Sequence, residues 1–173
     1  NIDTVKTADV SVALTSDIAV SGEWSLDDGQ QTGTISNKVT SQAINISGAA
    51  DGTHILKFKG ENEFGDGVLT EYMFTVDTLP PRLQISSPYN GGFYENSVIV
   101  KGISDAGANV FIGTGESEPQ KVTVGENGVF EQPVSLDSTV AYQNIIVYAE
   151  DAVGNQSTPI TLELTNKEIA NPN

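Results

Sequence analysis

The chain has no cysteine, and histidine, methionine and tryptophan occur only once each in its 173 residues. The lack of thiols excludes disulfide frameworks, thiolate zinc sites and cysteine nucleophiles. Basic residues are also few, with 8 Lys and Arg against 23 Asp and Glu, so the formal net charge is −15. A nucleic-acid binder needs a basic surface to displace counterions from phosphate, and anionic lipid also favours basic proteins. We therefore expect no nucleic-acid partner.

Long apolar runs are missing as well. No stretch approaches the roughly 20 apolar residues that a membrane-spanning helix needs, so membrane insertion is not expected. The chain begins at Asn1 without a secretory signal pattern, and we expect it to be an excised or processed piece of a longer protein.

Helical periodicity is also absent, and short alternating strands separated by Gly, Asn and Asp take its place. Val10, Val12 and Leu14 alternate with small or polar residues, and Ile18, Val20, Trp24 and Leu26 share one parity. We expect this second set, including Trp24, to face a core. Further strands are predicted at 34–46, from His54, at 72–76, 83–85, 98–103, 110–112, 121–124, 130–136, 145–149 and 160–164. Short strands spaced about ten residues apart favour an all-β sandwich.

Two consecutive prolines, Pro80 and Pro81, interrupt this pattern near the middle of the chain. Proline fixes φ and donates no backbone hydrogen bond, so no sheet should run through this point. An ungapped self-match supports a boundary here, because residues 55–66 align with residues 144–155 at an offset of 89 residues. Repetition at domain length predicts two tandem modules, at 4–79 and 80–166, with 167–173 as the start of a next linker or tail.

Several short motifs of the chain resemble those of a known family of tandem repeats. Residues 149–155, Ala-Glu-Asp-Ala-Val-Gly-Asn, resemble the "A-x-D-x-x-G-N" ending of tandem bacterial immunoglobulin-like (Big-type) repeats, and residues 76–81, Val-Asp-Thr-Leu-Pro-Pro, resemble their "V-D-T-x-P-P" junction. Residues 24–29, 51–54, 87–91 and 107–110 are similar to other segments of such repeats. The first copy departs from the pattern at residues 62–66, where Asn-Glu-Phe-Gly-Asp replaces Asp…Gly-Asn.

The resemblance implies two tandem immunoglobulin-like β-sandwich domains from a secreted or cell-surface bacterial protein. The expected role is that of non-catalytic spacer or stalk modules in an adhesin or S-layer-like protein, which hold a functional head at a distance. The neighbouring modules of the same chain would be the partners. The alternative is an accessory glycan- or protein-binding module of a secreted hydrolase, with a glycan or a host protein as ligand.

Catalytic residues are not evident in the sequence. The single histidine, His54, shares strand parity with Leu56 and Phe58, and no "G-x-S-x-G" nucleophile motif is present. The acidic group Glu61, Glu63 and Asp66 lies on a short loop and is expected to be a solvated turn. We expect no enzyme activity and no required cofactor.

Calcium is the one ion that the sequence suggests. Asp77, Asp105, Asp151 and Asn155 fall on loops expected near the junction of the modules, and Ca²⁺ prefers several such oxygen ligands. The competing interpretation is that Asp and Asn at turns bind their own backbone amides and need no metal.

Two further hypotheses concern a group of aromatic residues and a possible covalent crosslink. Tyr89, Phe93 and Tyr94 are the candidate ligand-binding aromatics, with packing at the boundary between the modules as the competing interpretation. A Lys101–Asn144 isopeptide bond is considered because their strands could be neighbours, although no catalytic acid is evident for it.

Overall fold

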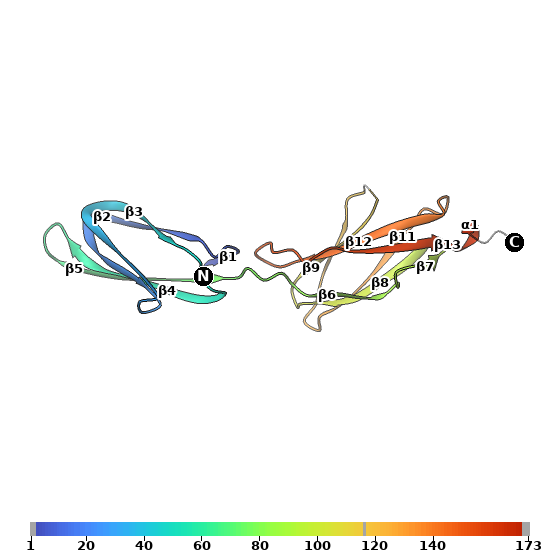
Figure 1. The fold of residues 1–173 in the computed structure, drawn as a ribbon, viewed down its shortest axis with the longest axis horizontal. Helices are drawn as coiled ribbons and strands as arrows, with labels where there is room; N and C mark the ends of the chain where they lie inside the picture. Colours follow the sequence, from blue (N-terminus) through green and yellow to red (C-terminus); the bar gives the residue numbers. More distant parts are fainter. Residues whose placement is uncertain (1–2, 116, 171–173) are drawn as a thin grey trace. The chain divides into compact units, whose positions relative to one another are not determined.

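A computed structural model of the chain describes residues 3–115 and 117–170. It divides into two compact units, Asn1–Leu79 (unit 1) and Pro80–Asn173 (unit 2). Nearly all regular structure in the described residues is β-strand, and one short helix, α1 (Lys167–Ala170), follows the last strand (Figure 1). The all-β prediction is confirmed.

Unit 1 is built from five strands that hydrogen-bond in the order β1-β5-β4-β2-β3 (Figure 1). They are β1 (Asp3–Val5), β2 (Val10–Leu26), β3 (Gln31–Ile46), β4 (Gly52–Asn62) and β5 (Gly67–Val76). β2 and β3 are long and pair along most of their length, whereas β4 joins β2 only between Val20 and Leu26. The inward side chains Ile44 and Ile46 of β3 join Leu56 of β4 and Phe74 of β5 in one core cluster.

A register shift corrects one expectation about β2. The two predicted strands at its ends are one continuous strand of 17 residues, whose register against β3 shifts between Thr15 and Val20. Within this irregular stretch the strict alternation of side chains is interrupted, although the same parity faces the core before and after it. Ile18 lies inside the stretch between Thr15 and Val20 and is 40% exposed, contrary to the expectation, whereas Val20 is buried and Trp24 is partly buried against the core.

Unit 2 is a two-layer sandwich, with sheets of order β10-β9-β12-β13-β7 and β11-β8-β6. Its strands are β6 (Leu83–Ser87), β7 (Gly92–Tyr94), β8 (Ser97–Ser104), β9 (Asn109–Thr114), β10 (Gln120–Thr123), β11 (Val129–Ser135), β12 (Tyr142–Glu150) and β13 (Ile160–Asn166). The inward side chains of both sheets form a single core cluster that includes Val100, Val110, Ile145 and Val147.

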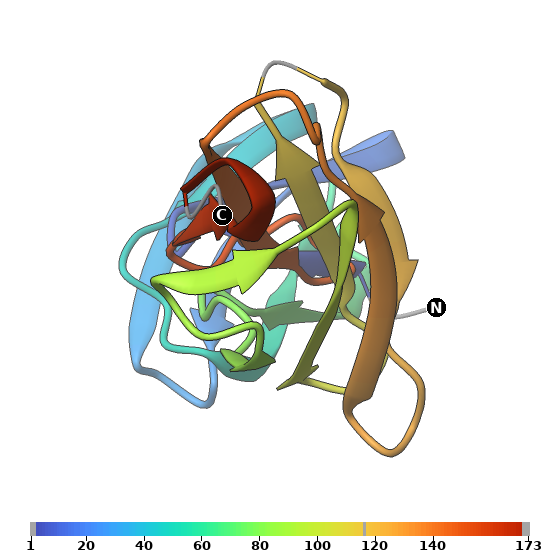
Figure 2. The ribbon, with the colours of Figure 1, turned by 90° about the vertical axis from the view of Figure 1, so that its right-hand side faces the viewer.

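A short helix follows the last strand of unit 2. The segment 167–173 begins with α1, which lies at the end of unit 2 that faces the viewer in Figure 2; residues 171–173 lie outside the described residues. Among the described residues, no helix has the length and apolar character needed to cross a bilayer.

Candidate functional site

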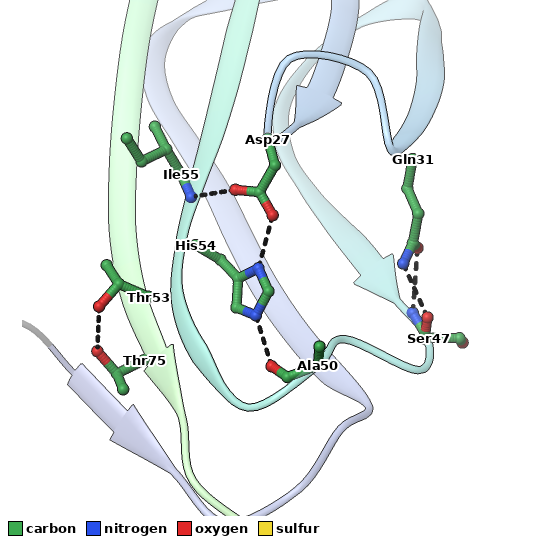
Figure 3. Close-up of polar contacts among 8 residues, drawn as sticks. All are labelled: Asp27, Gln31, Ser47, Ala50, Thr53, His54, Ile55 and Thr75. Carbon is green, nitrogen blue, oxygen red and sulfur yellow. Dashed lines mark hydrogen bonds and ion pairs between the residues drawn. The ribbon is translucent and has the colours of Figure 1, made fainter.

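His54 and Asp27 form the most buried titratable pair in the described parts of unit 1. Asp27 lies in the turn between β2 and β3, and His54 lies near the start of β4 (Figure 3). Asp27 and Asp28 adopt left-handed backbone angles, with φ of 45° and 55°, which Asp tolerates better than most residues. This turn directs the Asp27 carboxylate back towards β4.

The contacts of the pair form a short chain of hydrogen bonds. The Asp27 Oδ2 lies 2.6 Å from His54 Nδ1, and the Asp27 Oδ1 accepts a hydrogen bond of 2.8 Å from the Ile55 amide. On the other side of the ring, His54 Nε2 lies 2.7 Å from the Ala50 carbonyl oxygen. His54 therefore connects the β2–β3 turn to the β3–β4 loop (Figure 3).

The protonation state follows from these partners. Both ring nitrogens face acceptors, so only the charged imidazole can donate both hydrogen bonds at once, and these contacts favour that form. Burial disfavours that charge, but the hydrogen bonds to Ala50 and Asp27 and the Asp27 charge outweigh it and raise the pKa of His54. Burial likewise opposes the Asp27 charge, but hydrogen bonds from Ile55 and His54 lower the pKa of Asp27.

The pair resembles the carboxylate–histidine half of a hydrolase triad only in part. In such a triad the second ring nitrogen accepts the proton of a hydroxyl nucleophile. Here Nε2 donates to a backbone carbonyl instead. The geometry suits a pair that fastens two loops together. Nearby, Gln31 pairs with the backbone of Ser47 after β3, and Thr53 of β4 pairs with Thr75 of β5 (Figure 3).

The predicted calcium ligands have partners within their own units. Both carboxylate oxygens of Asp105 bind Arg82, Oδ2 accepting from its backbone amide at 2.9 Å and Oδ1 from its Nε at 3.0 Å. These bonds lower the pKa of Asp105. The Asp77 carboxylate accepts a hydrogen bond from the Leu79 amide at 3.3 Å.

Asp151 and Asn155 bind each other across their turn. Asp151 Oδ1 accepts from the amides of Val153 and Asn155, and its Oδ2 accepts from Asn155 Nδ2 at 2.8 Å. Burial opposes the Asp151 charge, but these donors outweigh it and lower the pKa. Within residues 3–115 and 117–170, no group of three or more His, Cys, Asp or Glu side chains is arranged to hold a metal ion.

The three candidate aromatics do not form one surface. Tyr89 and Phe93 are 68% and 61% exposed, whereas Tyr94 is 3% exposed and belongs to the unit 2 core. Its hydroxyl donates to the carbonyl oxygens of Asp137 and Val140. The Tyr94 ring therefore offers no face to a ligand.

Lys101 and Asn144 are not brought together. Lys101 lies on β8 and forms an ion pair of 2.9 Å with Glu131, whereas Asn144 is exposed on β12, in the other sheet. The isopeptide hypothesis is therefore wrong, because strands that are both central in their sheets need not be neighbours.

Sequence reasoning missed the Asp27–His54 pair. The parity of His54 places it beside Leu56 and Phe58, and neither parity nor turn chemistry reveals which distant loop a side chain will reach. The sequence feature that could have revealed the pair is the Asp27-Asp28-Gly29 turn, because its left-handed residues direct the Asp27 carboxylate inward.

Comparison with known proteins gives the fold. No protein-family model matches the chain, and no curated protein matches it. Among solved structures, the fibronectin(III)-like modules of Clostridium thermocellum CbhA match at 17% identity and a TM-score of 0.56, over 96% of this chain and 90% of that one. The chain therefore has the fold of fibronectin(III)- and immunoglobulin-like β-sandwich modules.

Two more distant matches have TM-scores below 0.5. A Ca²⁺-stabilized adhesin with which an Antarctic bacterium binds ice matches at 21% identity and a TM-score of 0.40, over 96% of this chain and 46% of that one. The Bacteroides ovatus SGBP-B of a mixed-linkage glucan utilization locus matches at 21% identity and a TM-score of 0.32, over 95% and 42%.

Proposed function

We propose that the chain is a pair of non-catalytic spacer modules of a larger bacterial extracellular or cell-surface protein, holding a functional head at a distance. The observation that carries this proposal is the division of the chain into two compact units with separate cores, at the Leu79–Pro80 peptide bond. Serial modules of this kind extend a chain without needing a reaction centre. The similarity to the CbhA modules, over nearly the full length of both chains, supports a modular role.

The connecting segment suits a spacer because each of its ends is fastened to its own unit. In unit 1, Thr78 donates its backbone amide and its hydroxyl to the Asp51 carboxylate. In unit 2, Arg82 donates to Asp105 through its amide and its side chain. Between these anchors lie Leu79 and the two prolines, which restrict φ and act as a semi-rigid link.

The test is ¹⁵N relaxation on the whole chain and on a variant carrying Pro80→Gly and Pro81→Gly. A spacer predicts that the two units share one slow correlation time in the native chain, and that the glycine variant shortens it. A matched control carries Pro88→Gly, away from the connection. Two independent, fast correlation times in the native chain would contradict the spacer role.

Binding of a glycan or a host protein, as an accessory module of a secreted hydrolase, is the second candidate. The exposure of Tyr89 and Phe93 favours it, since solvent-facing rings stack on sugars or anchor protein interfaces. Screening the chain on a glycan array, beside a Tyr89→Ala and Phe93→Ala double variant, tests it. Signals that persist in the double variant would place the binding elsewhere.

Calcium binding by Asp77, Asp105, Asp151 and Asn155 stays a prediction. A ligand that binds only the folded state raises the Tm, so calorimetry in millimolar Ca²⁺ and in chelator measures it. Asp105→Asn is the informative variant, and an unchanged Tm in the native chain would end the prediction.

A further inference from the structure

One side of unit 1 holds an apolar groove between two strand edges. Its volume is about 770 Å³. One wall is the first half of β2, from Val10 to Ser16, and the other is β5 from Val68 to Tyr72, with β1 at one end. Core side chains of β3 and β4, including Ile44 and Phe58, form its floor.

Both walls are strand edges with unused pairing capacity. Residues 10–15 of β2 pair with β3, and β4 joins β2 only from Val20 onwards. β1 covers β5 only at Phe74–Val76. Among residues 3–79, no strand pairs with the second side of β2 at residues 10–15. Such an edge presents alternate backbone amides and carbonyls to an incoming strand.

In unit 2, a strand occupies the position that corresponds to the open groove of unit 1. β7 pairs in parallel with β13, the last strand of unit 2, and β1 pairs in parallel with β5, the last strand of unit 1. β7 ends 89 residues after β1, at Tyr94 and Val5, and this distance equals the offset of the sequence repeat. β8 then corresponds to the first half of β2. In unit 2, β6 pairs antiparallel with β8, and its Leu83 and Ile85 pack on the core. No described strand of unit 1 takes the place of β6.

The burial of the two units agrees with this difference. In unit 2, Val100 of β8 is fully buried, and the core is a single cluster. In unit 1, Val10, Val12 and Leu14 face inward but stay only partly buried, and the core is split into two clusters. Side chains that already point inward need only a covering strand to complete their burial.

We propose that this groove is a strand-acceptor site. Its occupant is one extended polypeptide strand of β6-like chemistry, with apolar side chains at alternate positions. It pairs antiparallel with Val10–Ser16 and is joined to the chain ahead of β1, in the order that β6, β7 and β8 follow. Backbone hydrogen bonds to β2 supply affinity, and two apolar side chains entering the groove supply selectivity.

The test adds the missing strand to the full chain. A copy of residues 83–89 joined ahead of residue 1 reproduces the spacing between β6 and β7. The matched control carries the same addition with aspartate at its leucine and isoleucine positions, so unit 1 itself is unchanged. We expect the apolar addition to raise the Tm of unit 1 by about 5 °C or more, and the aspartate control to leave it unchanged.

Hydrogen exchange identifies where the added strand lies. Every second amide between Val10 and Ser16 should gain protection with the apolar addition, while the amides of unit 2 keep theirs. A free peptide of residues 83–89 should act in the same place but more weakly, since joining the strand raises its effective concentration.

Three results would overturn the proposal. The first is an equal Tm for the apolar and aspartate additions. The second is stabilisation by the free peptide without stabilisation by the joined strand. The third is protection of the β2 edge in the unaltered chain that grows with protein concentration, which would make a second copy the occupant.

Discussion

Gly60 of β4 and Gly22 of β2 lie opposite each other in the antiparallel ladder between these strands. A Cβ on Gly60 would collide with the Ser21 carbonyl oxygen and with Gly22 itself, both of which are backbone and cannot move aside. Glycine is needed here for the close approach of two backbones.

We expect Gly60→Ala to destabilise unit 1 by about 2–3 kcal/mol, the usual cost of overpacking. Gly67→Ala on β5 is the matched control, because a Cβ there would meet nothing within 4 Å. Thermal unfolding followed by circular dichroism measures both, and equal Tm values for the two variants would refute the steric argument.

The His54–Asp27 pair predicts how stability depends on pH. The folded pKa of His54 is raised above 6.5, so its contribution is complete below that value and is lost as the pH rises through the folded pKa. The folded pKa of Asp27 is lowered below 3.8, so its contribution is lost as the pH falls through the folded value. The pair stabilises unit 1 most between about pH 4 and pH 6.5.

We therefore expect the free energy of unfolding to decrease from pH 6 to pH 9. With one histidine and no cysteine, only the terminal amine should also titrate in this window. His54→Phe should remove the pH dependence and cost about 2–3 kcal/mol at pH 6, since it leaves Asp27 without its cation. Urea titrations at several pH values measure this, and a stability that rises towards pH 9 would contradict it.

At the scale of elements, the turns at residues 62–66 and 151–155 form the same set of hydrogen bonds, although Asp and Asn have exchanged positions between them. In unit 2, the Asp151 carboxylate caps the turn and Asn155 donates to it. In unit 1, the Asn62 Oδ1 accepts from the amides of Phe64 and Asp66, and its Nδ2 donates to the Asp66 carboxylate at 3.1 Å. The sequence departure at residues 62–66 therefore preserves the turn.

This exchange predicts a compensating pair of substitutions. Asn62→Asp alone places a second carboxylate beside Asp66 and should cost about 1–2 kcal/mol, because the side-chain hydrogen bond is lost and like charges meet. Adding Asp66→Asn recreates the arrangement of unit 2 and should restore most of the stability. A double-mutant cycle on the Tm of unit 1 measures the coupling, and additive effects of the two substitutions would rule the compensation out.

At the scale of the whole molecule, two separate cores predict two unfolding transitions. Unit 2 has one continuous core cluster closed by β6, whereas the core of unit 1 is split and its groove is open. More complete burial of apolar surface stabilises more, so unit 1 should unfold at the lower temperature. Differential scanning calorimetry resolves this, and Gly60→Ala should shift only the lower transition. A single transition that moves as a whole would show that the units unfold together.

The sequence by itself determined the fold class. Its period-two alternation, regular turns, proline pair and 89-residue repeat depend only on local backbone sterics and on the burial of alternate side chains, which one sequence carries in full. For the same reason the strands of unit 2 lie close to their predicted positions.

Only the tertiary structure decided which distant groups meet. It brought Asp27 to His54, placed Tyr94 in the core, separated Lys101 from Asn144, merged two predicted strands into β2 and left one edge of that strand open. Each of these outcomes depends on strand neighbours and on a bulge, and alternation along a single strand specifies neither.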